Sequence, residues 1–375
     1  MLANNSIYTY LYIFSLLAVV IEVMGVSCRL RIFFTSLIMF LIFGMISLRW
    51  EVGTDWDTYF DLYNIVDINS SLFDIYHFDL GYVLLNIFSK YIYNDYSFYL
   101  IVNTVLSSCL IFFILLKYGN YPAIGLFIFL TNYIPIHFIG SNRRSIAISC
   151  ILLLYIFSFY NKKIIYRLSI YLFAFFQHKT VIVVAPILLL NRLFNRLNLN
   201  IWFVFCAIFV SIGFGYFGFH GLLMSAISSL SHINPNFSIL TTISDYSEGI
   251  YLDQTPDAID PFFQSFLSIC KRMIMLSIFF YGVKKNRDLL SIYLLKIYIF
   301  GVILYCLFIG APLLQVLSIY FLIVEILIIS RVWSYFSKNE KIFIFPYIAI
   351  NGTLSYNSSL SIYPELFFPY KSILF

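Results

Sequence analysis

Charged side chains are scarce in this chain of 375 residues: they make up 11% of it, while hydrophobic residues make up 61%. A soluble domain needs a larger polar surface, so this composition excludes one. A transmembrane helix needs about 20 mostly apolar residues, and the mean hydropathy of +0.90 allows many such segments. The sequence therefore predicts an all-α, polytopic membrane protein surrounded by the lipid bilayer.

Several other signals are missing. The six cysteines lie in or at the ends of apolar segments, without the spacing of metal ligands or of a disulfide framework, so we predict no metal site and no cofactor. The net charge of +5 is modest, and we expect no nucleic-acid partner. No internal repeat, low-complexity tract or long linker is present, which predicts that residues 1–375 form a single integral membrane domain.

Hydropathy predicts about 11–13 transmembrane helices. The candidate spans are 7–27, 32–48, 97–116, 121–139, 146–160, 164–177, 180–190, 199–219, 263–281, 291–310, 313–330 and 342–354. We place most of the 23 basic residues in cytoplasmic loops, as the positive-inside rule requires. Segment 80–93 then cannot be a full crossing, so we expect it to lie along the interface or to dip in and return. Segments 164–177 and 180–190 are short and are expected to form a bent or re-entrant pair.

This orientation leaves two external loops, about 49–96 and 220–262, which carry most of the 18 acidic residues. The polar cluster at 49–59 gathers one arginine, three carboxylates and two tryptophans between two hydrophobic spans. Asp55 and Asp57 form an Asp-X-Asp pair, but no nucleotide-sugar domain accompanies them. A general base, or a ligand of sugar hydroxyls, is therefore favoured over a metal site. The alternative is an ordinary polar loop with an aromatic belt.

Arg143 and Arg144 lie on the predicted external side, against the positive-inside trend, where a helix returns into the membrane. The free N–H groups at a helix N-terminus attract anions, and guanidinium groups bind phosphate oxygens in a bidentate way. The pair therefore predicts a pyrophosphate site. The alternative is snorkelling or contact with lipid headgroups.

Other polar residues interrupt apolar segments. Lys271 and Arg272 fall inside the apolar run 263–281; intramembrane charge marks a site or pathway, unless the helix begins later and the pair only caps it. His178 lies on the external side and is either structural, a general base or a phosphate partner. For Glu22 and Glu325, structural pairing is favoured over function.

Local motifs, in this order, resemble the EpsG/Wzy family of bacterial polysaccharide polymerases. They are an Arg-x-x-x-Gly-x-Asp-x-x-x-Tyr signature at 49–59, an acidic-x-Gly-Tyr turn at 79–82, a helix start at 143–147 and a Phe-His-like turn at 176–181. The chain also departs from the family pattern. Arg144 stands where glutamine is usual, and Gln177 separates phenylalanine from His178. Val316 stands where many relatives have an arginine, a role that Arg272 could fill.

The resemblance implies an O-antigen or capsule repeat-unit polymerase with a GT-C-like architecture. Such an enzyme lies in the cytoplasmic (inner) membrane with its active site on the periplasmic, extracytoplasmic side. It transfers a growing glycan from polyprenyl pyrophosphate onto another lipid-linked repeat unit, and a chain-length-regulating co-polymerase is a further expected partner. The implied site residues are Asp55, then His178, then Asp57 as base; Arg49, Arg143, Arg144, Arg272 and Lys271 for pyrophosphate; and Tyr59, Asp79 and Tyr82 for sugar.

Two other functions remain open. A flippase for lipid-linked oligosaccharides would share the composition, but it is expected to show internal repeats and polar residues spread toward a midplane cavity, and neither is evident. An O-antigen ligase would share the arginines and would need a large external loop with a catalytic histidine. The loop 220–262, with His220 and His232, keeps the ligase open.

Overall fold

The computed structural model describes residues 6–25, 27–66, 79–189, 200–219, 221–222, 225, 261–309 and 311–374. Over these ranges the chain is helical, and its β contacts amount to one isolated bridge between Arg49 and Ser372. The prediction of an all-α polytopic membrane protein is confirmed. The GT-C-like architecture and the count of 11–13 crossings stay predictions.

Six helical segments of the described chain are long and apolar enough to cross a membrane. They are Arg29–Ser47, Tyr96–Tyr118, Asn142–Phe159, Ser265–Asn286, Leu289–Leu307 and Val316–Tyr335. Shorter apolar helices are Ile7–Val23, Leu80–Ile92, Pro122–Asn132, Ile164–Gln177, Lys179–Leu189 and Ile201–Tyr216. The segment expected not to cross, 80–93, is the 13-residue helix α4 (Leu80–Ile92). At 1.5 Å per residue it is about 20 Å long, less than the roughly 30 Å of a bilayer core.

The span predicted at 342–354 is much shorter than the helix that contains it. The hydropathy window at 342–354 marks only the middle of helix α20, which runs Lys338–Ser361. Its start is fixed by a capping box, in which the Ser337 side chain accepts from the Glu340 N–H and the Glu340 carboxylate accepts from the Ser337 N–H. The helix continues through a polar stretch that hydropathy does not count.

The chain divides into two compact units. Unit 1 comprises Met1–His178, Gly282–Ser291 and Ile323–Phe375, and unit 2 comprises Lys179–Tyr281 and Ile292–Leu322. The single membrane domain over 1–375 stays a prediction.

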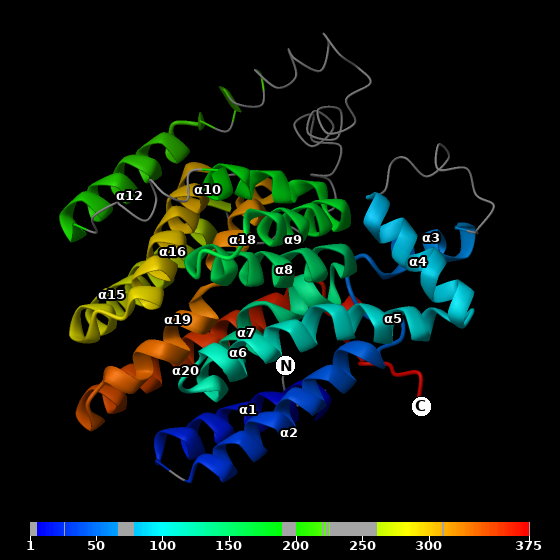
Figure 1. The fold of residues 1–375 in the computed structure, drawn as a ribbon, viewed down its shortest axis with the longest axis horizontal. Coiled ribbons are helices and arrows are strands. Elements are labelled where there is room, and N and C mark those ends of the chain that lie inside the picture. Colours follow the sequence, from blue (N-terminus) through cyan, green and yellow to red (C-terminus); the bar gives the residue numbers. More distant parts are fainter. Residues whose placement is uncertain are drawn as a thin grey trace. The chain divides into compact units, whose positions relative to one another are not determined.

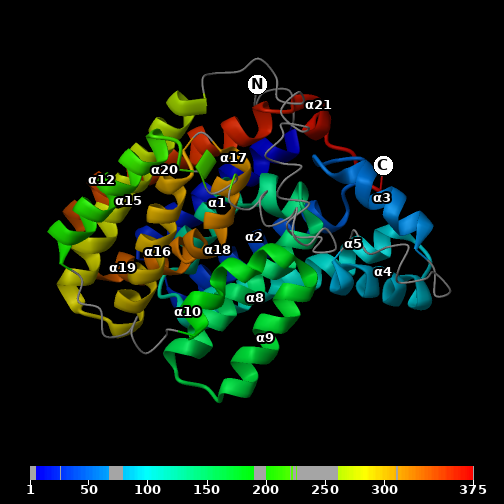
Figure 2. The same cartoon turned by 90° about the horizontal axis from the view of Figure 1, so that it is seen from above.

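Unit 1 is a bundle of long helices around α7. Its elements are α1 (Ser6–Val23), α2 (Cys28–Ser47), α3 (Trp56–Ile65), α4, α5 (Tyr96–Thr104), η2 (Val105–Cys109), α6 (Leu110–Tyr118), α7 (Pro122–Asn132), η3 (Ile134–Ile139), α8 (Asn142–Phe159), α9 (Ile164–Gln177), α19 (Glu325–Val332), η7 (Trp333–Tyr335), α20 and α21 (Pro364–Phe367). Helix α7 contacts α1, α19 and α20, and α8 packs against α9. Figures 1 and 2 show α8 beside α9, and α3 and α4 beside the N-terminal end of α5.

Two buried carboxylates hold helix ends in this bundle. Glu22 accepts hydrogen bonds from the backbone N–H groups of Ala123 (3.2 Å) and Ile124 (3.1 Å), which satisfies free donors at the start of α7. Glu325 accepts from the Asn132 amide at 2.9 Å and from the Tyr133 hydroxyl at 2.8 Å. The structural pairing predicted for both glutamates is confirmed.

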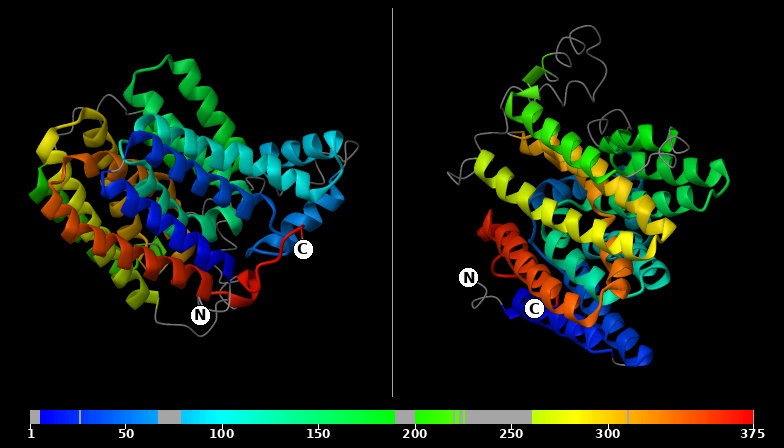
Figure 3. Two further views of the ribbon diagram at one scale, coloured as in Figure 1. Left: turned by 90° about the horizontal axis from the view of Figure 1, so that it is seen from below. Right: turned by 90° about the vertical axis from the view of Figure 1, so that its left-hand side faces the viewer.

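Unit 2 contains the remaining helices. They are η4 (Lys179–Val184), α10 (Ala185–Leu189), α12 (Ile201–Tyr216), α15 (Pro261–Asn286) up to Tyr281, α16 (Leu289–Leu307) from Ile292, α17 (Pro312–Gln315), η6 (Val316–Ser318) and α18 (Ile319–Leu322). Helices α15 and α16 lie side by side, as the right-hand view of Figure 3 shows, with the rings of Phe279 and Tyr298 5.1 Å apart. The pair predicted at 164–177 and 180–190 breaks at His178, between α9 and η4; its re-entrant course stays a prediction.

Candidate functional site

An aromatic core supports the motif residues at one end of unit 1. Helix α3 buries one face, with Trp56, Tyr59, Leu62 and Tyr63 at helical spacing. This face packs with side chains of α4 and α5 into one cluster, which includes Tyr82, Tyr96 and Tyr99. The loop 49–96, expected to be external, thus contains two packed helices that fix the direction of its polar side chains.

Two motif glycines allow close backbone contacts. Gly53 has φ +123°, and a Cβ there would lie 2.6 Å from the Ile139 carbonyl oxygen, so only glycine fits without strain. A Cβ at Gly81 would lie 2.8 Å from the Phe176 carbonyl carbon. The first contact holds the polar loop against the segment before α8, and the second holds α4 against the end of α9.

Arg143, in the first turn of α8, connects three of the predicted site residues. Its guanidinium donates to the Asp79 carboxylate at 3.2 Å and to the Tyr59 hydroxyl at 3.5 Å. It also lies over the rings of Tyr59 and Tyr82, at 5.6 and 6.0 Å from their centroids. The side chain of Asp79 is 5% exposed and that of Arg143 is 26% exposed, so one edge of the cation remains accessible.

Tyr59 connects this ion pair to Asp55. Its hydroxyl donates to the Asp55 carboxylate at 3.0 Å and lies 3.1 Å from the Ser141 hydroxyl. Burial raises the pKa of Tyr59, and the Asp55 charge adds to this against the opposite effect of Arg143. Tyr59 is therefore protonated at neutral pH and acts as a donor. Tyr59 and Tyr82 are both buried, so sugar contact by their rings would need an opening of the site, and that role stays a prediction.

Arg49 is the most deeply buried cation of the motif, at 1% exposure. Its guanidinium donates to the Ile46 carbonyl and to the Asn142 side-chain oxygen, while its Nε has no partner. Burial lowers the pKa of Arg49 from its usual value, and nearby tyrosines partly offset this. No described carboxylate forms an ion pair with it. Arg49 thus lies beneath the N-terminus of α8 and holds it through Asn142.

The other predicted residues of unit 1 differ in exposure. Arg144 is half-buried, and no hydrogen bond or ion pair joins it to the described residues. Asp57 is exposed in the first turn of α3, whereas Asp55 is half-buried at the helix N-cap. His178 is buried at the C-cap of α9, where its backbone N–H donates to the Ala174 carbonyl at 3.0 Å. The structure therefore brings together Asp55, Tyr59, Asp79 and Arg143, with Arg49 below them.

Lys271 and Arg272 belong to unit 2. Helix α15 begins at Pro261, so the pair lies about three turns into the helix and the alternative of an N-terminal cap is wrong. The reason is that the helix extends upstream of the apolar run. Arg272 lies 3.8 Å from the Tyr305 ring centroid and donates to the Ser268 carbonyl at 3.1 Å. A charge held in this way meets an aromatic face and a backbone acceptor. His220 and His232, with loop 226–260, lie outside the described residues.

Sequence reasoning missed the polar network beneath Arg143. The Asn142 side chain accepts from Arg49 and donates to the Tyr96 hydroxyl at 3.3 Å, and the Asn103 amide donates to the Asn142 carbonyl at 3.0 Å. Asn103 is a polar residue inside an apolar span, and this is the only feature of the sequence that could have indicated its role. His137 is also buried, with Nδ1 unpaired, in the π-helical turn η3.

The described residues contain no group of three or more His, Cys, Asp or Glu side chains that could hold a metal ion. The candidate site therefore consists of the Arg143–Asp79 ion pair, the half-buried carboxylate of Asp55, the adjacent Arg144 and the N-terminus of α8. Such a set can bind an anion and accept a proton.

Comparison with known proteins agrees with the resemblance. No curated protein and no solved structure shows a significant match. A family model described as the EpsG family matches residues 31–372, which include every motif named above. The chain therefore belongs to the EpsG family, polysaccharide polymerase-type proteins of the membrane.

Proposed function

We propose that this protein polymerises lipid-linked glycan repeat units at the extracytoplasmic face of the cytoplasmic membrane. The observation that carries the proposal is the cluster at the start of α8, where Arg143 is held by Asp79 and Tyr59 beside the half-buried carboxylate of Asp55. A cation at a helix N-terminus suits a pyrophosphate, and a carboxylate nearby suits proton transfer from a sugar hydroxyl.

The reaction is a glycosyl transfer. The acceptor hydroxyl attacks the anomeric carbon of the growing glycan, a new C–O bond forms, and the bond from that carbon to the pyrophosphate oxygen breaks. The proton of the hydroxyl passes to a base, and polyprenyl pyrophosphate leaves with the bonding electrons. Asp55 is our first choice as base, since Tyr59 orients its carboxylate; His178 and Asp57 follow in that order.

Charge neutralisation makes pyrophosphate a good leaving group. Fixed cations stabilise negative charge that develops in a transition state, and they do so best when little reorganisation is needed. Arg143 is positioned by its contacts, and Arg144 has no described ion-pair partner to give up. Arg49 acts as a positioning residue beneath Asn142. For Lys271 and Arg272, pyrophosphate binding is a proposal from sequence.

The test is Arg143→Ala in the native host, with the surface glycan run on a gel and the protein detected in the membrane. We expect the glycan ladder to disappear while a single repeat unit is still displayed, because export and ligation do not depend on polymerisation. Arg29→Ala is the matched control, since Arg29 is exposed and has no described partner. It should leave the ladder intact.

Other outcomes separate the competing functions. Loss of all surface glycan, with lipid-linked units retained inside, would identify a flippase. An unchanged ladder would remove Arg143 from the site. Because Asp79 is buried, Arg143→Ala could also harm folding; the double variant Asp79→Asn, Arg143→Met removes both charges and should give the same loss of ladder at normal membrane levels.

A further inference from the structure

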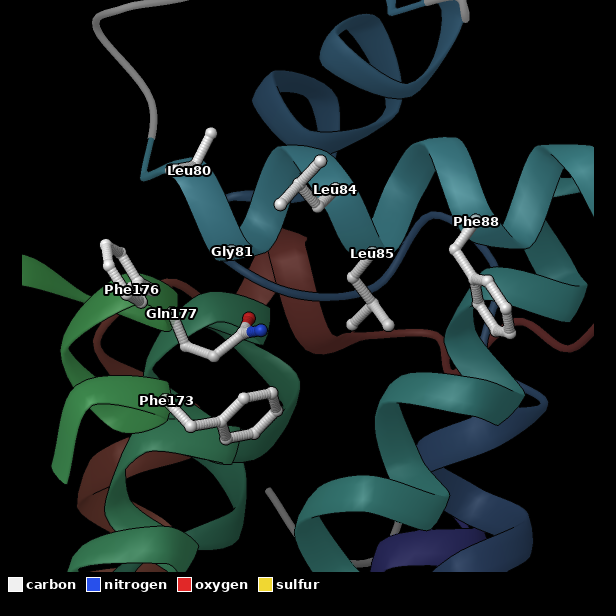
Figure 4. A pocket seen from close by; sticks show the side chains of 8 residues that line it. All are labelled: Leu80, Gly81, Leu84, Leu85, Phe88, Phe173, Phe176 and Gln177. Carbon is white, nitrogen blue, oxygen red and sulfur yellow. The ribbon is translucent and has the colours of Figure 1, made fainter. Parts of the chain in front are cut away.

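A groove of about 360 Å³ runs between α4 and α9 in unit 1 (Figure 4). Its volume lies within the range of about 300–1,000 Å³ that is usual for ligand sites. Leu84, Leu85 and Phe88 line it from α4, and Phe173 and Phe176 line it from α9. The walls are thus almost wholly apolar.

The lining side chains are incompletely covered by protein. Leu84, Phe88, Phe173 and Phe176 are each about half exposed, although all belong to packed helices. A contiguous apolar patch of this kind marks a contact with lipid or with an apolar ligand. A groove, unlike a smooth lipid-facing surface, selects a chain that can enter between the two helices.

One polar atom in the groove lacks a partner. Gln177 is 2% exposed, and its Oε1 forms no hydrogen bond. Figure 4 shows its amide pointing into the groove from the end of α9. A buried acceptor without a donor costs free energy, so this atom indicates a ligand that supplies an O–H or N–H group at this end.

The same end of the groove adjoins the proposed pyrophosphate site. Leu80 lines the groove and directly follows Asp79, the residue paired with Arg143. Gly81 brings the backbone of α4 against that of Phe176. A ligand with its phosphates near Arg143 and an apolar tail along α4 would fill both regions without a gap.

We propose that the groove binds the isoprenoid chain of the lipid-linked substrate, in the part next to its pyrophosphate; this rests on the proposed function. The chain contacts the leucine and phenylalanine side chains. Neither an isoprenoid nor an ionised pyrophosphate has a donor for Gln177 Oε1. The donor is therefore a hydroxyl or amide N–H of the sugar attached to the pyrophosphate.

The test measures binding to the full chain purified in detergent. The probes are undecaprenyl pyrophosphate and inorganic pyrophosphate, with phosphatidylglycerol as competitor. We expect the lipid probe to bind at least about tenfold more tightly than inorganic pyrophosphate, because each buried methylene adds to affinity. Leu84→Trp, which fills the groove, should remove this difference and leave binding of inorganic pyrophosphate unchanged.

Ile92→Trp is the matched control, since Ile92 is exposed at the far end of α4, outside the groove lining. It should keep the difference. Phe88→Ala, which widens the groove, is the second variant and should weaken binding of the lipid probe alone. Gln177→Met should weaken binding of lipid-linked repeat units extracted from a polymerase-deficient host, but not of undecaprenyl pyrophosphate.

The proposal is overturned if Leu84→Trp and Phe88→Ala keep the full difference, if Ile92→Trp loses it equally, or if phosphatidylglycerol competes as well as the lipid probe. The last result would assign the groove to ordinary phospholipid. Failure here is distinct from failure of the proposed function. Loss of all surface glycan in the Arg143→Ala host, with lipid-linked units retained inside, contradicts the polymerase, whereas unaltered lipid binding in the groove variants contradicts the groove alone.

Discussion

Arg143 and Arg144 are neighbours in sequence but have different surroundings. Adjacent positions on a helix point about 100° apart, so Arg143 faces Asp79 and Tyr59, whereas Arg144 has no ion pair with a described residue. Arg143 is held by the protein with one edge accessible, whereas Arg144 can bind an anion without giving up an ion pair to a described residue. The two are therefore not expected to be interchangeable, and a lysine at position 143 would lose the planar contacts to both partners.

Substitution of Asp55 and of Asp57 tests which of the two carboxylates acts as the general base. Asp55→Asn should lower the polymerisation rate by about 10²–10⁴-fold, the usual contribution of general acid–base catalysis, because it removes the carboxylate that Tyr59 orients. Asp57→Asn should have little effect, since Asp57 is exposed. The measurement is the rate of chain extension in membranes supplied with lipid-linked repeat units.

Tyr59→Phe is the comparison for Asp55→Asn, because it keeps the ring and the Asp55 carboxylate but removes the hydroxyl that contacts Asp55, Arg143 and Ser141. A smaller loss than that of Asp55→Asn is expected. If Asp57→Asn abolishes extension while Asp55→Asn does not, the order of the candidate bases is wrong.

At the scale of elements, the polar loop before α3 is held by the C-terminal segment. Gly53 donates its N–H to the Leu366 carbonyl at 2.9 Å, Trp50 to the Lys371 carbonyl at 3.0 Å, and Ile373 to the Leu48 carbonyl at 3.0 Å. Figure 2 and the left-hand view of Figure 3 place this segment beside α3. The conformation of the motif loop thus depends on residues more than 300 positions away in the chain.

Deletion of residues 364–375 should therefore abolish the glycan ladder while the protein still inserts into the membrane, because the loop loses its backbone partners. Tyr370→Phe keeps the backbone contacts of the segment and removes the hydrogen bond from the Tyr370 hydroxyl to the Met45 carbonyl. It should cost about 0.5–1.5 kcal/mol of stability and retain the ladder. A full ladder from the truncated protein would show that the segment does not support the site.

The turn before α16 offers a pH-dependent contact. Asp288 accepts from the Ser291 N–H at 3.2 Å and from Arg331 at 2.8 Å. Burial raises the pKa of Asp288, but the hydrogen bonds from Ser291 and Arg331 outweigh it, so the pKa lies below its usual value. A carboxylate with a lowered pKa stabilises the fold above its unfolded pKa of about 3.9, and this contribution is lost as the pH falls through the folded pKa.

Asp288→Asn should therefore destabilise the purified protein by about 1.5–3 kcal/mol at neutral pH. The difference from the wild type should shrink as the pH falls below about 4. Thermal unfolding in detergent, followed by tryptophan fluorescence at several pH values, measures both. A difference that stays constant down to the acid limit would contradict the ionic role of this contact.

At the scale of the whole molecule, hydropathy was a good guide to the helices and a poor one to their ends. Apolar runs at 32–48, 97–116 and 291–310 fall within or nearly coincide with helices of the structure. They could be predicted because a bilayer requires about 20 apolar residues per crossing, whatever the neighbours are. Helix α20 extends on both sides of its predicted span, since its ends are set by a side-chain cap and by packing rather than by hydropathy.

The sequence by itself determined the class of protein, the positions of the long helices and the motif residues of the family. These depend on composition and on local order along the chain. The pairing of Arg143 with Asp79, the burial of Arg49 beneath Asn142 and the groove beside Gln177 were decided only by the tertiary structure. Each joins residues that are far apart in the chain, and such long-range contacts arise from packing that no local pattern specifies.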